Sequence, residues 1–260
     1  MLGPGAGPCT LIHATIAATA GADPAALFPA GHDGLWLDPS DLSTMFQDVA
    51  GTMPVTSPGD PVRLLQDKSG NGNDVVAPSD AARPVYQEAE GLHWLEFDGV
   101  DDELATVMPL PFATEIFNCT AFRSLSFSSS YPHIVCNRSA SGGRENRHPL
   151  VFLSSSIADS VTASFGGNGR RATIGTAVTG LDIVAHALAS ASETEVHANG
   201  AVTLGAGVTL TDGSTDPFTI AGPNKANIRF YGAMQVNGVP SNAQIAAVRA
   251  YFASKSGQVA

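Results

Sequence analysis

The chain has 260 residues, of which 43% are hydrophobic and only 14% are charged, and it contains 27 glycines and 17 prolines. This composition provides enough apolar side chains for the core of one all-β domain with many turns. The formal net charge of −11 argues against nucleic acid as a partner, because phosphate binding needs a positive surface field.

The N-terminal residues 1–30 are rich in alanine, glycine and proline and nearly free of charge. Their apolar stretch follows no basic residue and is interrupted by proline and glycine, so we expect neither a signal peptide nor membrane insertion. We interpret the segment as an extended arm that attaches to a partner. The odd number of cysteines (Cys9, Cys119 and Cys136) does not indicate a disulfide framework and suits synthesis in a reducing cytoplasm.

After the arm, "GLWLDPSDLSTMFQD" predicts a short helical turn capped by Ser40 or Asp41. The next notable stretch is "DKSGNGNDVVAP", residues 67–78. Its acids, amides and glycines predict a turn, in which polar side chains bond to the backbone and the glycines take positive φ. Calcium binding is the alternative, although the spacing lacks the register of an EF-hand loop. The oxygen ligands would then come from Asp67, Asn71, Asn73 and Asp74.

Short apolar runs, many alternating with period two, then recur between turn signals and predict strands. They are "HWLEFDG", "ELATVMPL", "TAFRSLSFS", "HIVCN", "LVFLS", "SVTASFG", "RRATIGTAV", "LDIVAHALA", "TEVHANG", "PFTIAG" and "NIRFYGAMQVNG". Asn168-Gly169 and Asn199-Gly200 predict type I′ turns of antiparallel hairpins. His186 and His197 would face each other if the turn between their strands is tight.

The chain closes with a predicted helix over residues 241–254. Ser241 is its expected cap, Lys255 and Gly257 its closing residues, and Ile245, Val248, Tyr251 and Phe252 recur at helical spacing. The sequence therefore predicts an all-β antiparallel sandwich over residues 31–260, with one C-terminal helix and the N-terminal arm of residues 1–30.

Acidic residues provide the candidate chemistry. "FDGVDDEL" contains Asp98, Asp101, Asp102 and Glu103, which suit a calcium site or a carboxylate pair, but we favour an acidic turn between strands. Glu193 and Glu195 share a strand face with His197, the most enzyme-like arrangement in the chain. A solvated strand face explains it more simply. The histidines form no cluster with metal-ligand spacing. We therefore predict a protein without catalytic residues or a cofactor.

Arginines gather in two glycine-rich stretches, "NRSASGGRENRHP" and "GGNGRR", which we interpret as loops. If these loops meet at one rim, they form a positive patch suited to an acidic glycan or a neighbouring subunit. Scattered, solvated arginines are the equally weighted alternative. The predicted binding residues are Arg144, Asn146, Arg147, His148, Arg170 and Arg171.

Residues 34–104 and 227–257 resemble the laminin-G-like, concanavalin-A-like domains of tailed-phage and prophage virion proteins. The likeness is carried by "GLWLDPSDLSTMFQDVAGTMPVTSPGDPVRLLQDKSGNGNDVVAP", "ARP", "LEFDGVDDEL" and "RFYGAMQVNGVPSNAQIAAVRAYFASKSG". Residues 120–200 match only in the regular recurrence of predicted strands. The resemblance implies a jelly-roll sandwich with an attachment or surface role on a phage-like particle.

On this basis we expect a head spike, decoration protein or tail-fibre component that binds host surface glycans. The arm would join it to other virion proteins, as a homo-oligomer such as a trimer. The protein would be made in the bacterial cytoplasm and released on the virion surface by lysis. A glycoside hydrolase or lyase acting on surface polysaccharide, and a purely structural cement protein, are the alternatives.

Overall fold

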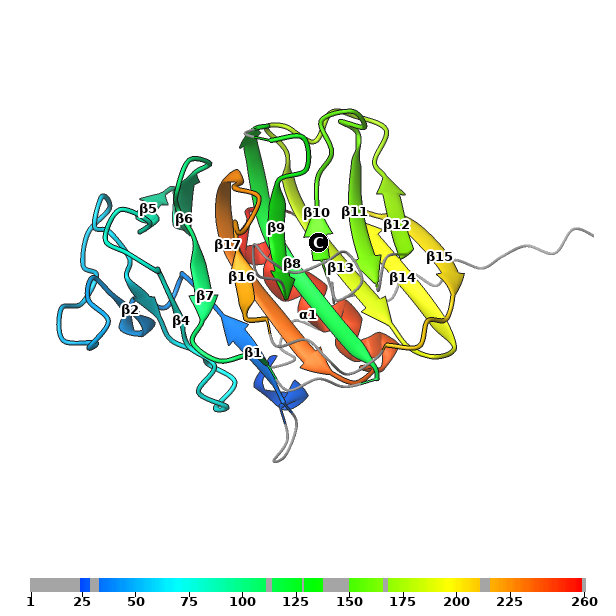
Figure 1. Cartoon of the computed structure of the whole chain (residues 1–260), viewed down its shortest axis with the longest axis horizontal. Helices are drawn as coiled ribbons and strands as arrows, with labels where there is room; N and C mark the ends of the chain where they lie inside the picture. The colour runs from blue at the N-terminus through cyan, green and yellow to red at the C-terminus, as the bar shows by residue number, and fades with distance from the viewer. Residues whose placement is uncertain are drawn as a thin grey trace, which may run out of the picture.

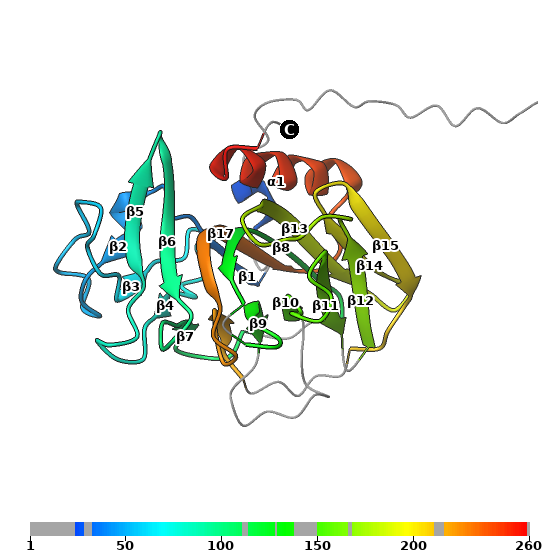
Figure 2. The ribbon, with the colours of Figure 1, turned by 90° about the horizontal axis from the view of Figure 1, so that it is seen from above.

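The computed structural model describes residues 24–28, 33–110, 114–127, 129–137, 150–165, 168–210 and 216–258. These residues form two antiparallel sheets packed face to face and one α-helix, which covers the outside of one sheet (Figure 1, Figure 2). The predicted two-sheet antiparallel sandwich with a closing helix is therefore confirmed. Within the described ranges, no helix is long and apolar enough to cross a membrane.

The first sheet, sheet A, has the strand order β15-β14-β13-β8-β17-β6-β5, and β1 also pairs with β17. Its central strand β17 lies between β8 and β6 (Figure 1). The strands are β1 (Gly34–Leu37), β5 (Val85–Ala89), β6 (Leu92–Asp98), β8 (Ile116–Ser126), β13 (Asp182–Ala189), β14 (Glu193–Ala198), β15 (Ala201–Ala206) and β17 (Asn227–Asn237).

The second sheet, sheet B, has the order β12-β11-β10-β9-β16-β7-β4-β3-β2. It consists of β2 (Met45–Phe46), β3 (Leu64–Leu65), β4 (Val75–Val76), β7 (Leu104–Thr106), β9 (His133–Asn137), β10 (Leu150–Phe152), β11 (Ser160–Phe165), β12 (Asn168–Thr173) and β16 (Phe218–Ile220). Two short 3-10 helices, η1 (Pro24–Leu27) and η2 (Leu42–Thr44), complete the described elements besides the α-helix. Asp41 caps η2, and it is one of the two residues that were predicted as the cap of this turn.

The inner strands of sheet A are buried on both faces, because alternate residues of these strands enter different apolar clusters. In β13, Ile183 and Ala185 join the core between the two sheets, whereas Val184 and Leu188 join a second cluster on the outer side. This follows from the two-residue period of a strand. Burial on both faces explains why β13 reads as an almost continuous apolar run.

Helix α1 (Asn242–Lys255) covers the outer face of sheet A over β8, β13 and β17 (Figure 2). Its start is a capping box, in which Ser241 accepts from the backbone of Gln244 and the Gln244 side chain accepts from the backbone of Ser241. Ile245, Val248 and Phe252 are buried against the outer cluster. The predicted helix and its cap are confirmed.

Helix η1 lies within the predicted arm of residues 1–30. It contacts α1, and its Leu27 belongs to the outer apolar cluster. Residues 1–23 and 29–32 lie outside the described residues. The attachment role of the arm stays a prediction.

One of the two predicted Asn-Gly turns is confirmed. Ala198 pairs with Ala201, which leaves Asn199 and Gly200 as the connection, with φ of 45° and 89°. The other prediction is wrong, because Asn168 pairs with Phe165 and therefore belongs to strand β12. The reason is that Gly166-Gly167 precede Asn168 and tolerate positive φ equally well. Gly166-Gly167 and Asn168-Gly169 are both suitable pairs for a two-residue turn, so the sequence alone did not determine the register of this hairpin.

The stretch at residues 67–78 is a turn that leads into strand β4, as predicted. Its side chains bind β1: the Asp67 carboxylate accepts hydrogen bonds from the backbone of Trp36 at 2.8 Å and of Asn73 at 3.0 Å. The Asn73 side-chain amide donates to the carbonyl of Gly34 at 2.7 Å. Both glycines of the "GNG" tripeptide have positive φ. The polar side chains of this turn therefore fix the position of β1.

Candidate binding site

A cleft of about 660 Å³ opens between helix α1 and the outer side of the β13–β14 hairpin. Strands β13 and β14 provide one wall, and α1 with the residues that follow it provides the other. The lining residues are Asp182, Val184, His197, Asn199, Gly200, Ala246, Arg249, Ala250, Ala253 and Gln258.

The hairpin wall is fixed by the side-chain amide of Asn199, the first residue of the type I′ turn. Its Nδ2 donates to the carbonyl of Asp182 at 2.8 Å, and its Oδ1 accepts from the backbone of Val184 at 2.9 Å. Gln258, which follows α1, donates to the carbonyl of Asp182 and to Oδ1 of Asn199. These bonds join the two walls, so the cleft has a defined shape without a ligand.

Asp182, at the start of β13, is held from the sheet side. Arg123 Nε donates to its Oδ1 at 2.8 Å, Arg123 also bonds to its Oδ2, and the hydroxyl of Tyr231 donates to Oδ1 at 2.7 Å. Burial, together with the hydrogen bond to Asp182 and the charge of this carboxylate, raises the pKa of Tyr231. Tyr231 therefore stays a hydrogen-bond donor at neutral pH.

Two stacked histidines lie beside the cleft. His186 and His197 are register partners, and their rings stack at 5.1 Å with an angle of 8°, which confirms the prediction that they face each other. His186 Nε2 lies 2.9 Å from Glu195 Oε1. This hydrogen bond lowers the pKa of Glu195, so the carboxylate is ionised and His186 donates. The Nδ1 atoms of both histidines are buried without a hydrogen-bond partner among the described residues.

His197 is the member of this pair that lines the cleft, and it is only 3% exposed. Burial, the positive charge of Arg249 and the neighbouring His186 lower its pKa to about 3, against the weaker opposite effect of Glu195. The imidazole is therefore neutral at physiological pH and offers one nitrogen as donor and one as acceptor.

Arg249 places a cation in the helix wall. It follows the buried Ile245 by four residues and precedes the buried Ala253 by four, so it lies on the face of α1 that packs on sheet A. Its guanidinium makes neither a salt bridge nor a hydrogen bond with the described residues. Burial lowers the pKa of Arg249, although Cys119 and Glu195 oppose this effect. The sequence analysis did not single out Arg249. Its spacing of four residues from the apolar Ile245 and Ala253 is the pattern that could have identified it.

The predicted arginine patch is only partly within the described residues. Arg170 and Arg171 belong to strand β12, which agrees with the strand predicted for "RRATIGTAV" and not with the loop assumed for "GGNGRR". They point to opposite faces: Arg170 Nε donates to the buried Thr194 hydroxyl at 3.2 Å, whereas Arg171 is exposed. A strand alternates its side chains, so these two arginines do not form one surface. Arg144, Asn146, Arg147 and His148 lie outside the described residues.

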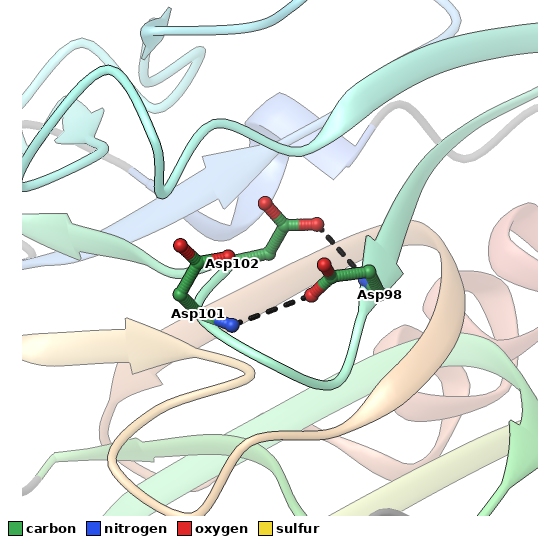
Figure 3. Close-up of side chains that lie close together, drawn as sticks. All are labelled: Asp98, Asp101 and Asp102. Carbon is green, nitrogen blue, oxygen red and sulfur yellow. Dashed lines mark hydrogen bonds between the residues drawn. The ribbon is translucent and has the colours of Figure 1, made fainter.

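The acidic stretch after β6 brings three carboxylates together (Figure 3). Oxygens of Asp98, Asp101 and Asp102 lie within 4.8 Å of one another. The Asp102 carboxylate accepts from the backbone of Asp98 at 2.8 Å, and the Asp98 carboxylate accepts from the backbone of Val100 at 2.7 Å. Glu103 pairs instead with Lys225 at 2.6 Å. Hydrogen bonds within the turn account for the positions of the Asp98 and Asp102 side chains, in agreement with the favoured interpretation of an acidic turn.

Replacing Asp102 with asparagine should stabilise the protein at neutral pH. Burial, together with the charges of Asp98 and Asp101, raises the Asp102 pKa from 3.8 to about 6. A raised folded-state pKa makes the carboxylate a source of stability below pH 4 that is lost as the pH rises through 6. The variant should gain about 1–3 kcal/mol in unfolding free energy at pH 7. Denaturant titrations at pH 7 and at pH 3.5 measure this difference.

At pH 3.5 the Asp102 variant and the parent protein should be equally stable, since both side chains are then neutral. A variant that is less stable at pH 7 would contradict the prediction. The alternative interpretation, a calcium site, is tested by melting temperatures measured with calcium and with a chelator. Stabilisation by calcium that is lost in the Asp102 variant would indicate a metal site.

Comparisons with known proteins concern the fold. No family model and no curated protein matches the chain. A sialidase of Trypanosoma rangeli, in complex with 2,3-difluoro-KDN, matches with a TM-score of 0.51 and 9% identity, over 90% of this chain and 34% of the sialidase. This chain therefore spans about a third of the length of that protein.

Two further structures have similar scores. Botulinum neurotoxin type C, which depends on interaction with two ganglioside molecules to enter cells, matches with a TM-score of 0.55 and 9% identity, over 85% of this chain and 51% of that chain. Domain 4 of AbnA, a GH43 extracellular arabinanase from Geobacillus stearothermophilus, in complex with arabinotriose, matches with a TM-score of 0.51 and 10% identity, over 70% of this chain and 92% of that domain. At these identities the likeness shows a shared β-sandwich fold.

Proposed function

We propose that this protein is a non-catalytic carbohydrate-binding module that holds a glycan in the cleft between α1 and the β13–β14 hairpin. The observation that carries the proposal is the cleft itself, a preformed and partly polar recess of about 660 Å³. Small-ligand sites commonly have volumes of about 300–1,000 Å³ and a few fixed polar groups. The similar structures with a bound sugar or a ganglioside requirement support the same proposal, because they share the fold.

The surface beside the cleft suits a sugar ring, which has hydroxyl groups at its edge and apolar C–H groups on its faces. Strand β15 exposes Val202 and Leu204, at 51% and 66%. Val202 is the register partner of His197, and Leu204 is the partner of Glu195. An apolar strip therefore continues the outer face of sheet A beyond the polar cleft, and an oligosaccharide longer than the cleft would contact it.

The lining favours binding over hydrolysis. A glycosidase of the common type needs two carboxyl groups about 5–10 Å apart on either side of the bond that breaks. Among the lining residues described, Asp182 is the carboxylate, and Arg123 and Tyr231 already bind its oxygens. Glu195 is engaged by His186. Neither group is placed as a free acid or base facing the cleft.

Filling the cleft tests the proposal. Ala246 is an exposed helical residue that lines the cleft, so Ala246→Trp should block it without disturbing the core. Ala243→Trp makes the same substitution at an exposed position of α1 outside the lining and is the matched control. On a glycan array the parent protein and the Ala243 variant should bind the same saccharides, and the Ala246 variant should bind none. Equal binding by both variants would place the glycan elsewhere.

We further propose that the module works on the surface of a tailed-phage-like particle, as a spike, decoration or tail-fibre component that attaches to host glycans. The support is the sequence resemblance at residues 34–104 and 227–257. Electron microscopy of intact particles carrying an antibody-labelled copy tests this setting. Label on the outer surface is the expected result, and particles without the protein would contradict it.

A further inference from the structure

The Arg249 side chain has hydrogen-bonding capacity that the described part of the protein does not use. A guanidinium carries five N–H donors, and those of Arg249 find no acceptor among the described residues. Other arginines of the same outer face are paired: Arg123 with Asp182, and Arg229 with Glu96. Arg249 differs from them because it faces an open cleft.

The nearby negative groups do not substitute for a bonded partner. Glu195 acts on Arg249 through its charge but forms its hydrogen bond with His186, and Asp182 forms its bonds with Arg123 and Tyr231. The remaining neighbour, Cys119, is uncharged, because burial raises its pKa to about 12. The Arg249 guanidinium is only half-buried and its nitrogens are not among the buried atoms without a partner, so its N–H groups are accessible from the cleft and open to a ligand anion.

A second group in the cleft lacks a partner. His197 is 3% exposed, and its Nδ1 is buried without a hydrogen-bond partner among the described residues, so the other ring nitrogen, Nε2, is the atom that can meet a ligand. Because this imidazole is neutral, it suits a ligand hydroxyl, which both donates and accepts. The cleft therefore combines a free guanidinium with a neutral imidazole, in a recess whose other amides are occupied by bonds to the backbone.

We propose that the cleft is specific for a sugar that bears a carboxylate, such as a uronic or sialic acid, with Arg249 binding the carboxylate and His197 binding a neighbouring hydroxyl. This inference rests on the proposed glycan-binding function and names the class of its ligand. The planar guanidinium fork matches the two oxygens of a carboxylate, and such charge-assisted pairs are about twice as strong as neutral hydrogen bonds. A neutral sugar would leave the fork unused.

Matched saccharide pairs test the inference by calorimetric titration of the full chain. Trigalacturonate is compared with its carboxyl-reduced form, and sialyllactose with lactose; sulfated lactose is the third probe. We expect the parent protein to bind at least one acidic member about tenfold tighter than its neutral partner, a gain typical of a charged hydrogen bond. Arg249→Gln should reduce this ratio to about one. Arg171→Gln removes an exposed arginine of β12 outside the lining and should keep the ratio.

The outcomes separate the two proposals. Equal binding of acidic and neutral sugars by the parent protein, or a ratio retained in the Arg249 variant, would overturn the inference and leave glycan binding intact. Binding of no saccharide at all would overturn the proposed function as well. Sulfated lactose that binds as tightly as the carboxylates would overturn the carboxylate assignment. A ratio lost in the Arg171 variant would instead support the arginine patch. If Arg249→Gln does not fold, the ratio of the affinities of the parent protein for acidic and neutral saccharides decides whether the inference stands.

Discussion

Replacing Phe252 with alanine should lower the free energy of unfolding by about 3–5 kcal/mol, as is usual for a fully buried phenylalanine. Phe252 is 0% exposed and belongs to the outer apolar cluster that joins α1 to sheet A. Its ring lies over Gly232 of β17, where a Cβ atom would come within 2.7 Å of it. Denaturant-induced unfolding measures the loss.

The matched control is Asn242→Ala, at the exposed first residue of the same helix, which should change stability by no more than about 0.5 kcal/mol. Because α1 forms one wall of the cleft, the Phe252 variant should also bind saccharides more weakly. A loss of stability below about 1 kcal/mol would show that the helix contributes little to the sandwich.

Asp38→Asn should have the second large effect, a loss of about 3 kcal/mol, because it removes one partner of a buried charge network. The Asp38 side chain is 3% exposed, lies 3.3 Å from Lys68 and 3.6 Å from Lys255, and accepts a hydrogen bond of 2.5 Å from the Tyr251 hydroxyl. It thereby joins the end of β1 to the C-terminal turn of α1. In the variant, both ammonium groups lose their shared carboxylate.

The effect of Asp38→Asn should depend on pH. Burial alone would raise the Asp38 pKa, but hydrogen bonds from Ser40 and Tyr251 and the charges of both lysines outweigh it, so the pKa lies below 3.8. A depressed pKa contributes stability that is present above the unfolded-state value and lost as the pH falls through the folded-state value. The difference between parent and variant should therefore be full at pH 6 and shrink below pH 4. Asp33→Asn, at an exposed aspartate, is the control. A difference independent of pH would exclude the ionised carboxylate as the cause.

Local rules predicted much of the fold. Ser241 and Gln244 specify the start of α1 through bonds to their own backbone, and Asn199-Gly200 specify a turn through their positive φ. The stacked histidines followed from the register of a single hairpin. Such features depend on residues close together in the chain, so the sequence pattern is sufficient for them.

Features that depend on competing or distant partners were not predictable in the same way. The glycines before Asn168 offer two possible registers, and only pairing with β11 selects between them. That pairing also makes Arg170 and Arg171 strand residues with opposite orientations. The cleft requires α1 to dock on sheet A, which brings Arg249 beside a hairpin far earlier in the chain. Helical periodicity could have shown that Arg249 faces the sheet, but not which strands it meets.

The central place of β17 in sheet A has a consequence for how the chain folds. This strand pairs with β1, β6 and β8, all of which precede it by more than a hundred residues. During synthesis, the β5–β6 hairpin and the group from β8 to β15 emerge as two parts of a sheet with no strand between them. Loop closure over such separations is slow, so folding on a timescale of about milliseconds to seconds is expected, as for other sandwiches of high contact order. Until β17 is inserted, both flanking strands present unpaired edges, at which the incompletely folded chain can pair with other chains.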